Sequence, residues 1–153
     1  MAPSPNALLH LATLGPVGRL PAPGTWGSLV AVIAAPLFFL PLPLWGKLLV
    51  LICLIPLGTL ACNRAQSYYR REDPSPAIID EFTGQLLVFL PLREPNILLL
   101  VGGFFLFRFF DILKPWPIKA SESWFSGGFE VMLDDLLAGA LALLLLWTFV
   151  FLF

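Results

Sequence analysis

The sequence predicts an all-α, integral membrane bundle of about five short helices that are interrupted by prolines. The first observation is the composition, because 58% of the 153 residues are hydrophobic, 12% are charged and the mean hydropathy is +0.87. Soluble domains carry about 25% charged residues, and a soluble fold of this size could not bury so much apolar surface. The second observation is that 15 prolines divide the apolar sequence into pieces of helical length. We expect one membrane-embedded domain over residues 1–153.

The first two helices are expected to form a hairpin across the bilayer. The stretch Trp26–Trp45 covers about 20 residues, which matches a hydrocarbon core of roughly 30 Å, and its terminal tryptophans suit the two interfaces. Pro41 and Pro43 predict a turn. A second helix then covers about 44–62 and continues as a more polar helix through Tyr69.

A second hairpin and a last helix complete the bundle. Ser75 as N-cap, with Pro76 at the first helical position, predicts a third helix that runs to about Leu92. A fourth helix is expected over about 96–113, because Pro115 stops it. The fifth runs from about residue 130 to the C-terminus.

This layout places most of the basic residues on one side of the membrane, which the positive-inside rule makes cytoplasmic. They are Arg19, Arg64, Arg70, Arg71, Arg108, Lys114 and Lys119. Only Lys47 and Arg93 lie near the opposite turns. The net charge of −1 gives no basic excess for binding nucleic acid.

Three acidic clusters also fall on this side, each beside strongly apolar sequence. They are Asp80 with Glu81, Asp111, and Asp134 with Asp135. A carboxylate in such surroundings is costly unless something pairs with it, and a divalent cation removes the repulsion between converging carboxylates. Oxygen ligands favour Mg²⁺. The alternatives are a surface helix cap for the first cluster and an interfacial ion pair for Asp111.

Basic residues beside the acids point to a phosphate. In Arg108-x-x-Asp111-x-x-Lys114 one carboxylate stands between two cations on a helix face. Either Asp111 forms an interfacial ion pair with these cations, or it binds a metal while Arg108 and Lys114 bind a phosphate. Gly24, Thr25, Gly27 and Ser28 precede or open the first helix. Backbone N–H groups and hydroxyls at a helix start form an anion site, although a plain turn with an N-cap is the alternative.

Together these features predict a metal and phosphate site among apolar helices, and hence a phospholipid substrate. A small cation transporter or channel subunit is the alternative from a different class, because carboxylates within membranes often mark ion paths. A phosphotransferase that uses CDP-activated alcohols is a second rival, but its DGxxAR-type motif is absent.

The blocks LPAPGTWGSL, IIDEFTGQ, FRFFDILKPWPI and GGFEVMLDDLLAG, in this order, resemble the phosphatidylglycerophosphatase A family. The resemblance covers about residues 12–139. It implies a Mg²⁺-dependent, multi-pass phosphatase of the bacterial inner membrane that converts phosphatidylglycerophosphate to phosphatidylglycerol and phosphate, with its active site on the cytoplasmic face. Glu130 departs from the family, which more often has glycine there.

We therefore expect metal-assisted monoester hydrolysis. The family's acidic positions correspond to Asp80, Glu81, Asp111, Asp134 and Asp135, which would hold one or two Mg²⁺ ions and include the general base. Arg108, Lys114 and Arg64 would hold the phosphate, and the turn 24–28 would orient it. A covalent aspartyl-phosphate is an alternative, although no DxDx-type nucleophile motif is present.

Overall fold

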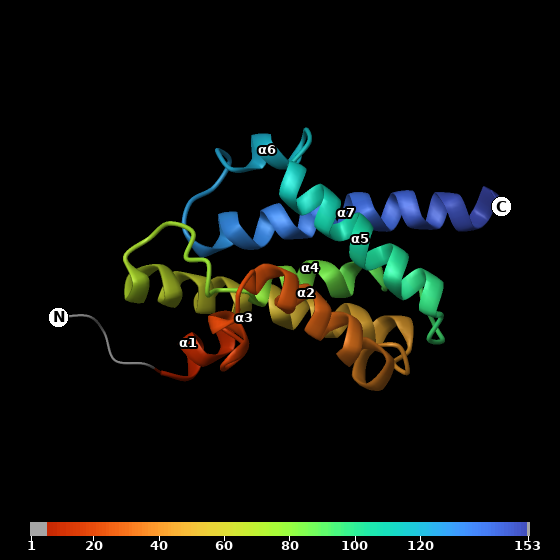
Figure 1. The fold of residues 1–153 in the computed structure, drawn as a ribbon, viewed down its shortest axis with the longest axis horizontal. Coiled ribbons are helices and arrows are strands. Elements are labelled where there is room, and N and C mark those ends of the chain that lie inside the picture. The colour runs from red at the N-terminus through yellow and green to blue at the C-terminus, as the bar shows by residue number, and fades with distance from the viewer. Residues whose placement is uncertain (1–5, 153) are drawn as a thin grey trace.

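The computed structural model describes residues 6–152, and within this range the regular structure is helical (Figure 1). It contains seven α-helices, a short 3₁₀ segment η1 and a π-helical segment η2. In chain order they are α1 (Ala7–Ala12), η1 (Val17–Arg19), α2 (Pro23–Ala34), η2 (Ala35–Phe39), α3 (Leu44–Tyr69), α4 (Ile79–Val88), α5 (Ile97–Leu113), α6 (Ile118–Ser121) and α7 (Gly128–Leu152).

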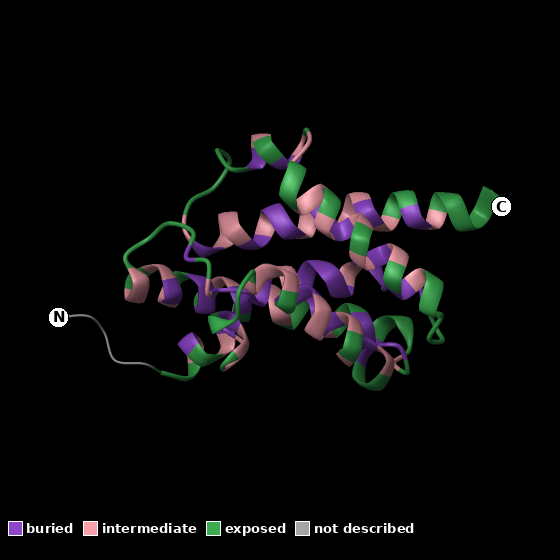
Figure 2. Ribbon diagram, in the orientation of Figure 1, coloured by how far each residue is buried: buried purple, intermediate pink, exposed green. Residues whose placement is uncertain are grey.

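Helices α3 and α7 are long and apolar enough to cross a membrane. They have 26 and 25 residues, with mean hydropathies of 2.0 and 2.2 in their most apolar windows, and only 28% of each window is buried. A core helix of a soluble protein would be mostly buried. Figure 2 shows buried residues concentrated where α4 meets α7, and exposed residues along the outer parts of α5 and α7. These apolar, outward-facing helices suggest membrane association.

Three of the predicted helices are confirmed nearly to their ends. Helix α3 extends to Tyr69, as expected for the second helix, and continues through Pro56. Helix α5 begins after Asn96, whose side chain accepts hydrogen bonds from the backbone N–H groups of Leu98 and Leu99 at 3.0 and 3.2 Å. Helix α7 begins at Gly128, two residues before the expected start.

The predicted start and end of the third helix were wrong. Ser75 and Pro76 belong to a turn, in which the N–H of Ala77 donates to the Pro74 carbonyl at 2.8 Å. The next N–H, of Ile78, donates to the carbonyl of Ala12 at 2.7 Å, so a tie to the end of α1 holds the chain out of helical geometry until residue 79. Helix α4 then ends at Val88, before the expected 92.

Other differences concern short segments. The first predicted helix begins earlier, at Pro23, and its regular part ends in the π-helical segment at Phe39, before the prolines 41 and 43. Helices α1 and α6, of six and four residues, were not predicted because they are too short to show a periodic pattern. Cys53 and Cys62, both on α3, are free thiols.

Helices α4 and α7 cross at two glycines with almost no side chain between their backbones. A Cβ atom placed on Gly139 would collide with the Gly84 carbonyl oxygen and lie 3.1 Å from its carbon. A Cβ atom on Gly84 would lie 2.5 Å from the carbonyl oxygen of Asp135 and 2.7 Å from the ring of Phe107. The absence of side chains at Gly84 and Gly139 therefore permits the close approach of the two helices.

Substitution of Gly139 by alanine should destabilise the protein. Because the new methyl group meets backbone rather than a flexible side chain, we expect the free energy of unfolding to fall by about 1–3 kcal/mol, as for other overpacked sites. The matched control is Gly102→Ala, whose Cβ would make an ordinary contact at 3.6 Å with Leu146. Unfolding in detergent micelles measures both variants, and equal stability of the two would contradict the close crossing.

Candidate active site

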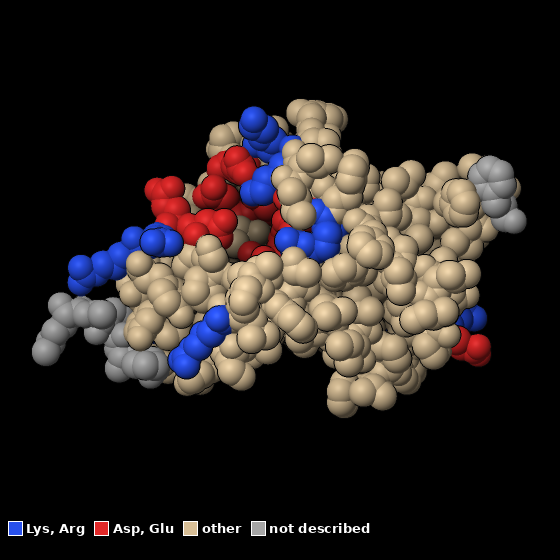
Figure 3. All heavy atoms as spheres, viewed as in Figure 1, with Lys and Arg blue, Asp and Glu red and all other residues tan. Residues whose placement is uncertain are grey.

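Charged side chains gather at one end of the bundle, where α4 and α7 begin and α5 ends (Figures 1 and 3). Figure 3 shows a hollow at this end that is lined by acidic residues and flanked by basic ones. Nine of the ten carboxylates of the sequence line this cavity, which has a volume of about 200 Å³. They are Glu72, Asp73, Asp80, Glu81, Asp111, Glu122, Glu130, Asp134 and Asp135. The tenth, Glu94, lies in the turn before α5.

Three of these carboxylates lie close enough to one another to hold a metal ion. One oxygen from each of Asp80, Glu81 and Asp135 can be chosen so that all three atoms lie within 4.8 Å of one another. Asp80 and Asp135 are only 6% and 4% exposed. The Asp80 Oδ1 and Glu81 Oε2 atoms are buried and have no hydrogen-bond partner among the described residues. Unpartnered buried carboxylate oxygens are costly, and a hard divalent cation would satisfy them.

The helix crossing brings the three residues together. Asp80 and Glu81 lie in the first turn of α4, where the helix dipole favours negative charge, and Gly84 follows Asp80 by one turn. Asp135 precedes Gly139 by one turn of α7. Since the two glycines are in contact, the carboxylates one turn before them must also be close.

Asp134 points toward α6 rather than toward the other three carboxylates. Its Oδ1 atom accepts a hydrogen bond from Ser121 Oγ at 2.7 Å, and its Oδ2 atom accepts one from Lys114 Nζ at 2.9 Å. Adjacent helical residues point about 100° apart, so Asp134 and Asp135 could not both face the same point. The protein itself therefore satisfies both oxygens of Asp134.

The predicted Arg108–Asp111–Lys114 arrangement is present, but its two cations have different partners. Arg108 Nη1 pairs with Asp111 Oδ2, and Asp111 lines the acidic cavity. Lys114 Nζ donates to Glu122 Oε1 at 2.7 Å as well as to Asp134. Burial lowers the pKa of Lys114, but its hydrogen bonds to these carboxylates outweigh burial and raise the pKa above the ordinary value. Lys114 is thus a fixed positive charge in the cavity.

The glycine-rich turn forms a second cavity, of about 270 Å³, beside the first. Its wall includes Gly24, Thr25 and Arg108, and it shares Asp73 and Glu81 with the acidic cavity. Gly24 lies directly against the charged groups, because a Cβ atom there would collide with the Glu81 carboxylate and lie 3.3 Å from Arg108 Nη1.

The other residues of the predicted phosphate site lie outside this second cavity. Gly27 packs on α4, where a Cβ atom would lie 3.0 Å from that of Ile78. Ser28 is fully buried, and its hydroxyl donates to the Gly24 carbonyl at 3.0 Å. Arg64, on α3, is not among the residues that line either cavity.

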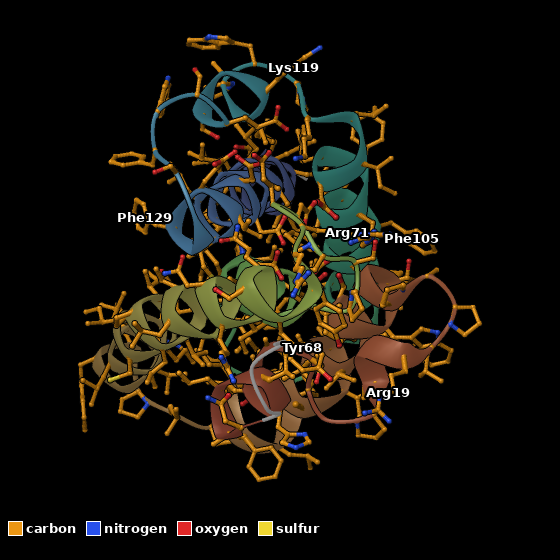
Figure 4. The ribbon with its side chains drawn as sticks, turned by 90° about the vertical axis from the view of Figure 1, so that its left-hand side faces the viewer. Arg19, Tyr68, Arg71, Phe105, Lys119 and Phe129 are labelled. Carbon is orange, nitrogen blue, oxygen red and sulfur yellow. The ribbon has the colours of Figure 1, made fainter. Side chains whose placement is uncertain are left out.

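Sequence reasoning missed several residues of the site, all outside the long helices. Glu72 and Asp73 follow α3, and Ser121 and Glu122 belong to the short helix α6 and its end. The available signal was the expectation that Arg70, Arg71 and Lys119, which are close to them in sequence, lie on the acidic side. Figure 4, which looks onto this end, shows Arg71 near the centre and Lys119 and Arg19 toward opposite rims.

Comparison with known proteins identifies the family. Residues 10–150 match the model of the family described as Phosphatidylglycerophosphatase A. The chain belongs to this family. A protein of Haemophilus influenzae named "Phosphatidylglycerophosphatase A" is 34% identical over 145 residues, which cover 91% of this chain and 86% of that protein. The corresponding protein of Escherichia coli is 33% identical over 122 residues, with 78% and 69% covered.

A third relative carries a different name. A protein of Bacteroides thetaiotaomicron named "Putative phosphatidylinositol-3-phosphatase" is 36% identical over 131 residues, covering 82% of this chain and 81% of that protein. No solved structure matches the chain. As a phosphatidylglycerophosphatase A homologue the protein is a phosphatase, which confirms the resemblance seen in the sequence and sets aside the transporter and phosphotransferase alternatives.

Loss of one carboxylate from the converging three should weaken metal binding. We expect Asp80→Asn and Asp135→Asn each to lower the affinity for Mn²⁺, an oxygen-preferring ion with a spectroscopic signal, by at least about tenfold. Electron paramagnetic resonance of the purified protein in detergent measures free Mn²⁺ directly. Glu94→Gln is the matched control, because it removes the one carboxylate outside the cavity. Equal affinity in all three variants would show that the cluster is no metal site.

Proposed function

We propose that the protein is a Mg²⁺-dependent phosphatase that hydrolyses phosphatidylglycerophosphate to phosphatidylglycerol and inorganic phosphate. The observation that carries this proposal is the convergence of Asp80, Glu81 and Asp135, with unpartnered buried oxygens, in a cavity that also contains a fixed lysine. The substrate comes from the family and from the two relatives that bear its name.

The converging carboxylates would hold the metal. Asp80, Glu81 and Asp135 supply oxygens, and Asp111 adds a fourth carboxylate from the same cavity wall. When bound, Mg²⁺ would neutralise phosphate oxygens and lower the pKa of a water molecule. Asp134 acts differently, because its hydrogen bonds to Lys114 and Ser121 would hold the lysine at the cavity.

The basic residues and the α2 turn would bind the substrate. Lys114 reaches the acidic cavity as a point charge, and Arg108 offers a planar fork beside Gly24 and Thr25. Gly27 and Ser28 would support this turn from behind through their packing on α4 and within α2. Arg64 would add positive charge near the same end of α3.

The proposed location is the bacterial inner membrane, with several membrane-spanning helices, one domain over residues 1–153 and the active site at the cytoplasmic face. The matched relatives are bacterial proteins. The separation of charge supports the orientation, since most of the basic residues visible in Figure 3 lie at the end with the acidic cavity.

Activity should depend on the acidic cavity and on Mg²⁺. We expect Asp80→Asn, Asp111→Asn and Asp134→Asn each to lower kcat for phosphatidylglycerophosphate on the order of 100-fold, as when one electrostatic group is lost from a buried site, and EDTA to abolish turnover. Phosphate release in mixed micelles measures this, with Glu94→Gln as the control. Phosphatidylinositol 3-phosphate belongs in the same assay because of the third relative. Full activity in all three Asn variants, or turnover that resists EDTA, would refute the proposal.

Membrane orientation can be tested by cysteine labelling of intact cells. In a Cys53→Ser background, a membrane-impermeant maleimide should label Glu94→Cys from outside, because this exposed residue lies at the end opposite the site. Lys119→Cys, exposed on α6, should react only after the membrane is permeabilised. The reverse pattern would place the active site outside the cytoplasm.

A further inference from the structure

The cations expected to bind one phosphate are divided between two cavities. Lys114 lines the acidic cavity but not the cavity at the start of α2, whereas Arg108 lines the second and not the first. Asp73 and Glu81 belong to both walls, so the cavities adjoin. A single phosphate group held among the converging carboxylates would therefore meet Lys114 and leave the Arg108 cavity unused.

The second cavity has groups suited to an anion that needs no metal. Arg108 contributes a planar fork, of which Nη1 pairs with Asp111 while the buried Nε atom has no hydrogen-bond partner among the described residues. Gly24 and Thr25 lie in the first turn of the 12-residue helix α2, whose N-terminus favours negative charge. Thr25 adds a hydroxyl to the wall of this cavity, and Gly24 lies where the Glu81 carboxylate and Arg108 Nη1 approach the helix start.

We propose that the cavity at the start of α2 binds the phosphodiester of the lipid head group while the acidic cavity binds the terminal phosphomonoester; this rests on the proposed function. Phosphatidylglycerophosphate carries both groups, joined by one glycerol unit. The diester has a single negative charge and is not cleaved in the proposed reaction, which suits one arginine and a helix N-terminus. The monoester has more charge and needs the metal.

This division explains how one site could serve the two lipids in the names of the relatives. Phosphatidylinositol 3-phosphate also carries a monoester on an alcohol that is joined through a phosphodiester to diacylglycerol. Phosphatidate has the monoester alone and would leave the Arg108 cavity without an anion. The enzyme should therefore select lipids by the presence of the diester, and tolerate different alcohols between the two phosphates.

The first test measures the binding of a lipid that carries the phosphodiester but no phosphomonoester. Phosphatidylglycerol, which lacks the monoester, should bind the EDTA-treated protein in nanodiscs, and Arg108→Gln should weaken this binding at least about tenfold, as for a charge-assisted contact. Lys119→Gln is the matched control and should leave the affinity unchanged, because this exposed cation lines neither cavity. Inorganic phosphate at equal concentration should not compete, which separates a lipid site from a general anion site.

Turnover gives the second measurement. With Mg²⁺, the wild type should have a kcat/KM for phosphatidylglycerophosphate at least about 100-fold above that for phosphatidate. Phosphatidate lacks the diester, so it would leave the polar groups of the Arg108 cavity without a partner. Arg108→Gln should remove most of this preference, mainly through KM, whereas Lys114→Gln should lower both rates. A circular dichroism spectrum shows that each variant is folded.

The outcomes separate the two proposals. The diester site would be overturned if the wild type and Arg108→Gln bound phosphatidylglycerol equally, or if Arg108→Gln lost turnover equally on both lipids. Either result would leave the proposed phosphatase function of the wild type standing. If no lipid were hydrolysed, the proposed function would fail, and the binding of phosphatidylglycerol in EDTA would still decide the role of Arg108.

Discussion

The contact between Gly84 and Gly139 is the constraint on which the rest of the structure depends. Any side chain at either position would meet the other helix's backbone, so the pair fixes how closely α4 and α7 can cross. Both helices begin at the same end of the bundle (Figure 1). Residues one turn before the glycines are therefore forced together, and these residues are Asp80 and Asp135. A purely geometric requirement of packing thus creates the electrostatic problem that a metal ion would solve.

The surrounding elements give some charged side chains protein partners and leave others available to a ligand. The short helix α6 holds Asp134 through Ser121, and Lys114 bridges Asp134 and Glu122, so this side of the cavity is satisfied by protein groups. Asp80, Glu81 and Asp135 keep unsatisfied or repelling oxygens and remain available to a ligand. The adjacent Arg108 and Gly24 give the same end of the molecule a region suited to negative charge. Groups suited to a metal ion and groups suited to a phosphate therefore lie within one small volume.

The rest of the bundle supports this end while remaining compatible with lipid. Helices α3 and α7 present apolar side chains outward over most of their length, and nearly all carboxylates are collected at one end. At the other end, the buried Lys47 donates to the carbonyls of Leu90 and Leu92 and so joins the two hairpin turns. The buried charge of Lys47 is thus stabilised by backbone carbonyl groups.

The sequence by itself determined the helical class, most of three long helices and the five candidate carboxylates, because hydropathy, prolines and caps act within a few residues along the chain. It also placed the acidic clusters on one side, since helix lengths fix which turns share a face. Only the tertiary structure decided that Asp135 rather than Asp134 joins Asp80 and Glu81, and that Arg108 and Lys114 serve different cavities. It also showed that Asp73 and Ser121 belong to the site and that α4 begins later than the sequence predicted. Both depend on contacts between segments far apart in sequence, such as the hydrogen bond of Ile78 with Ala12.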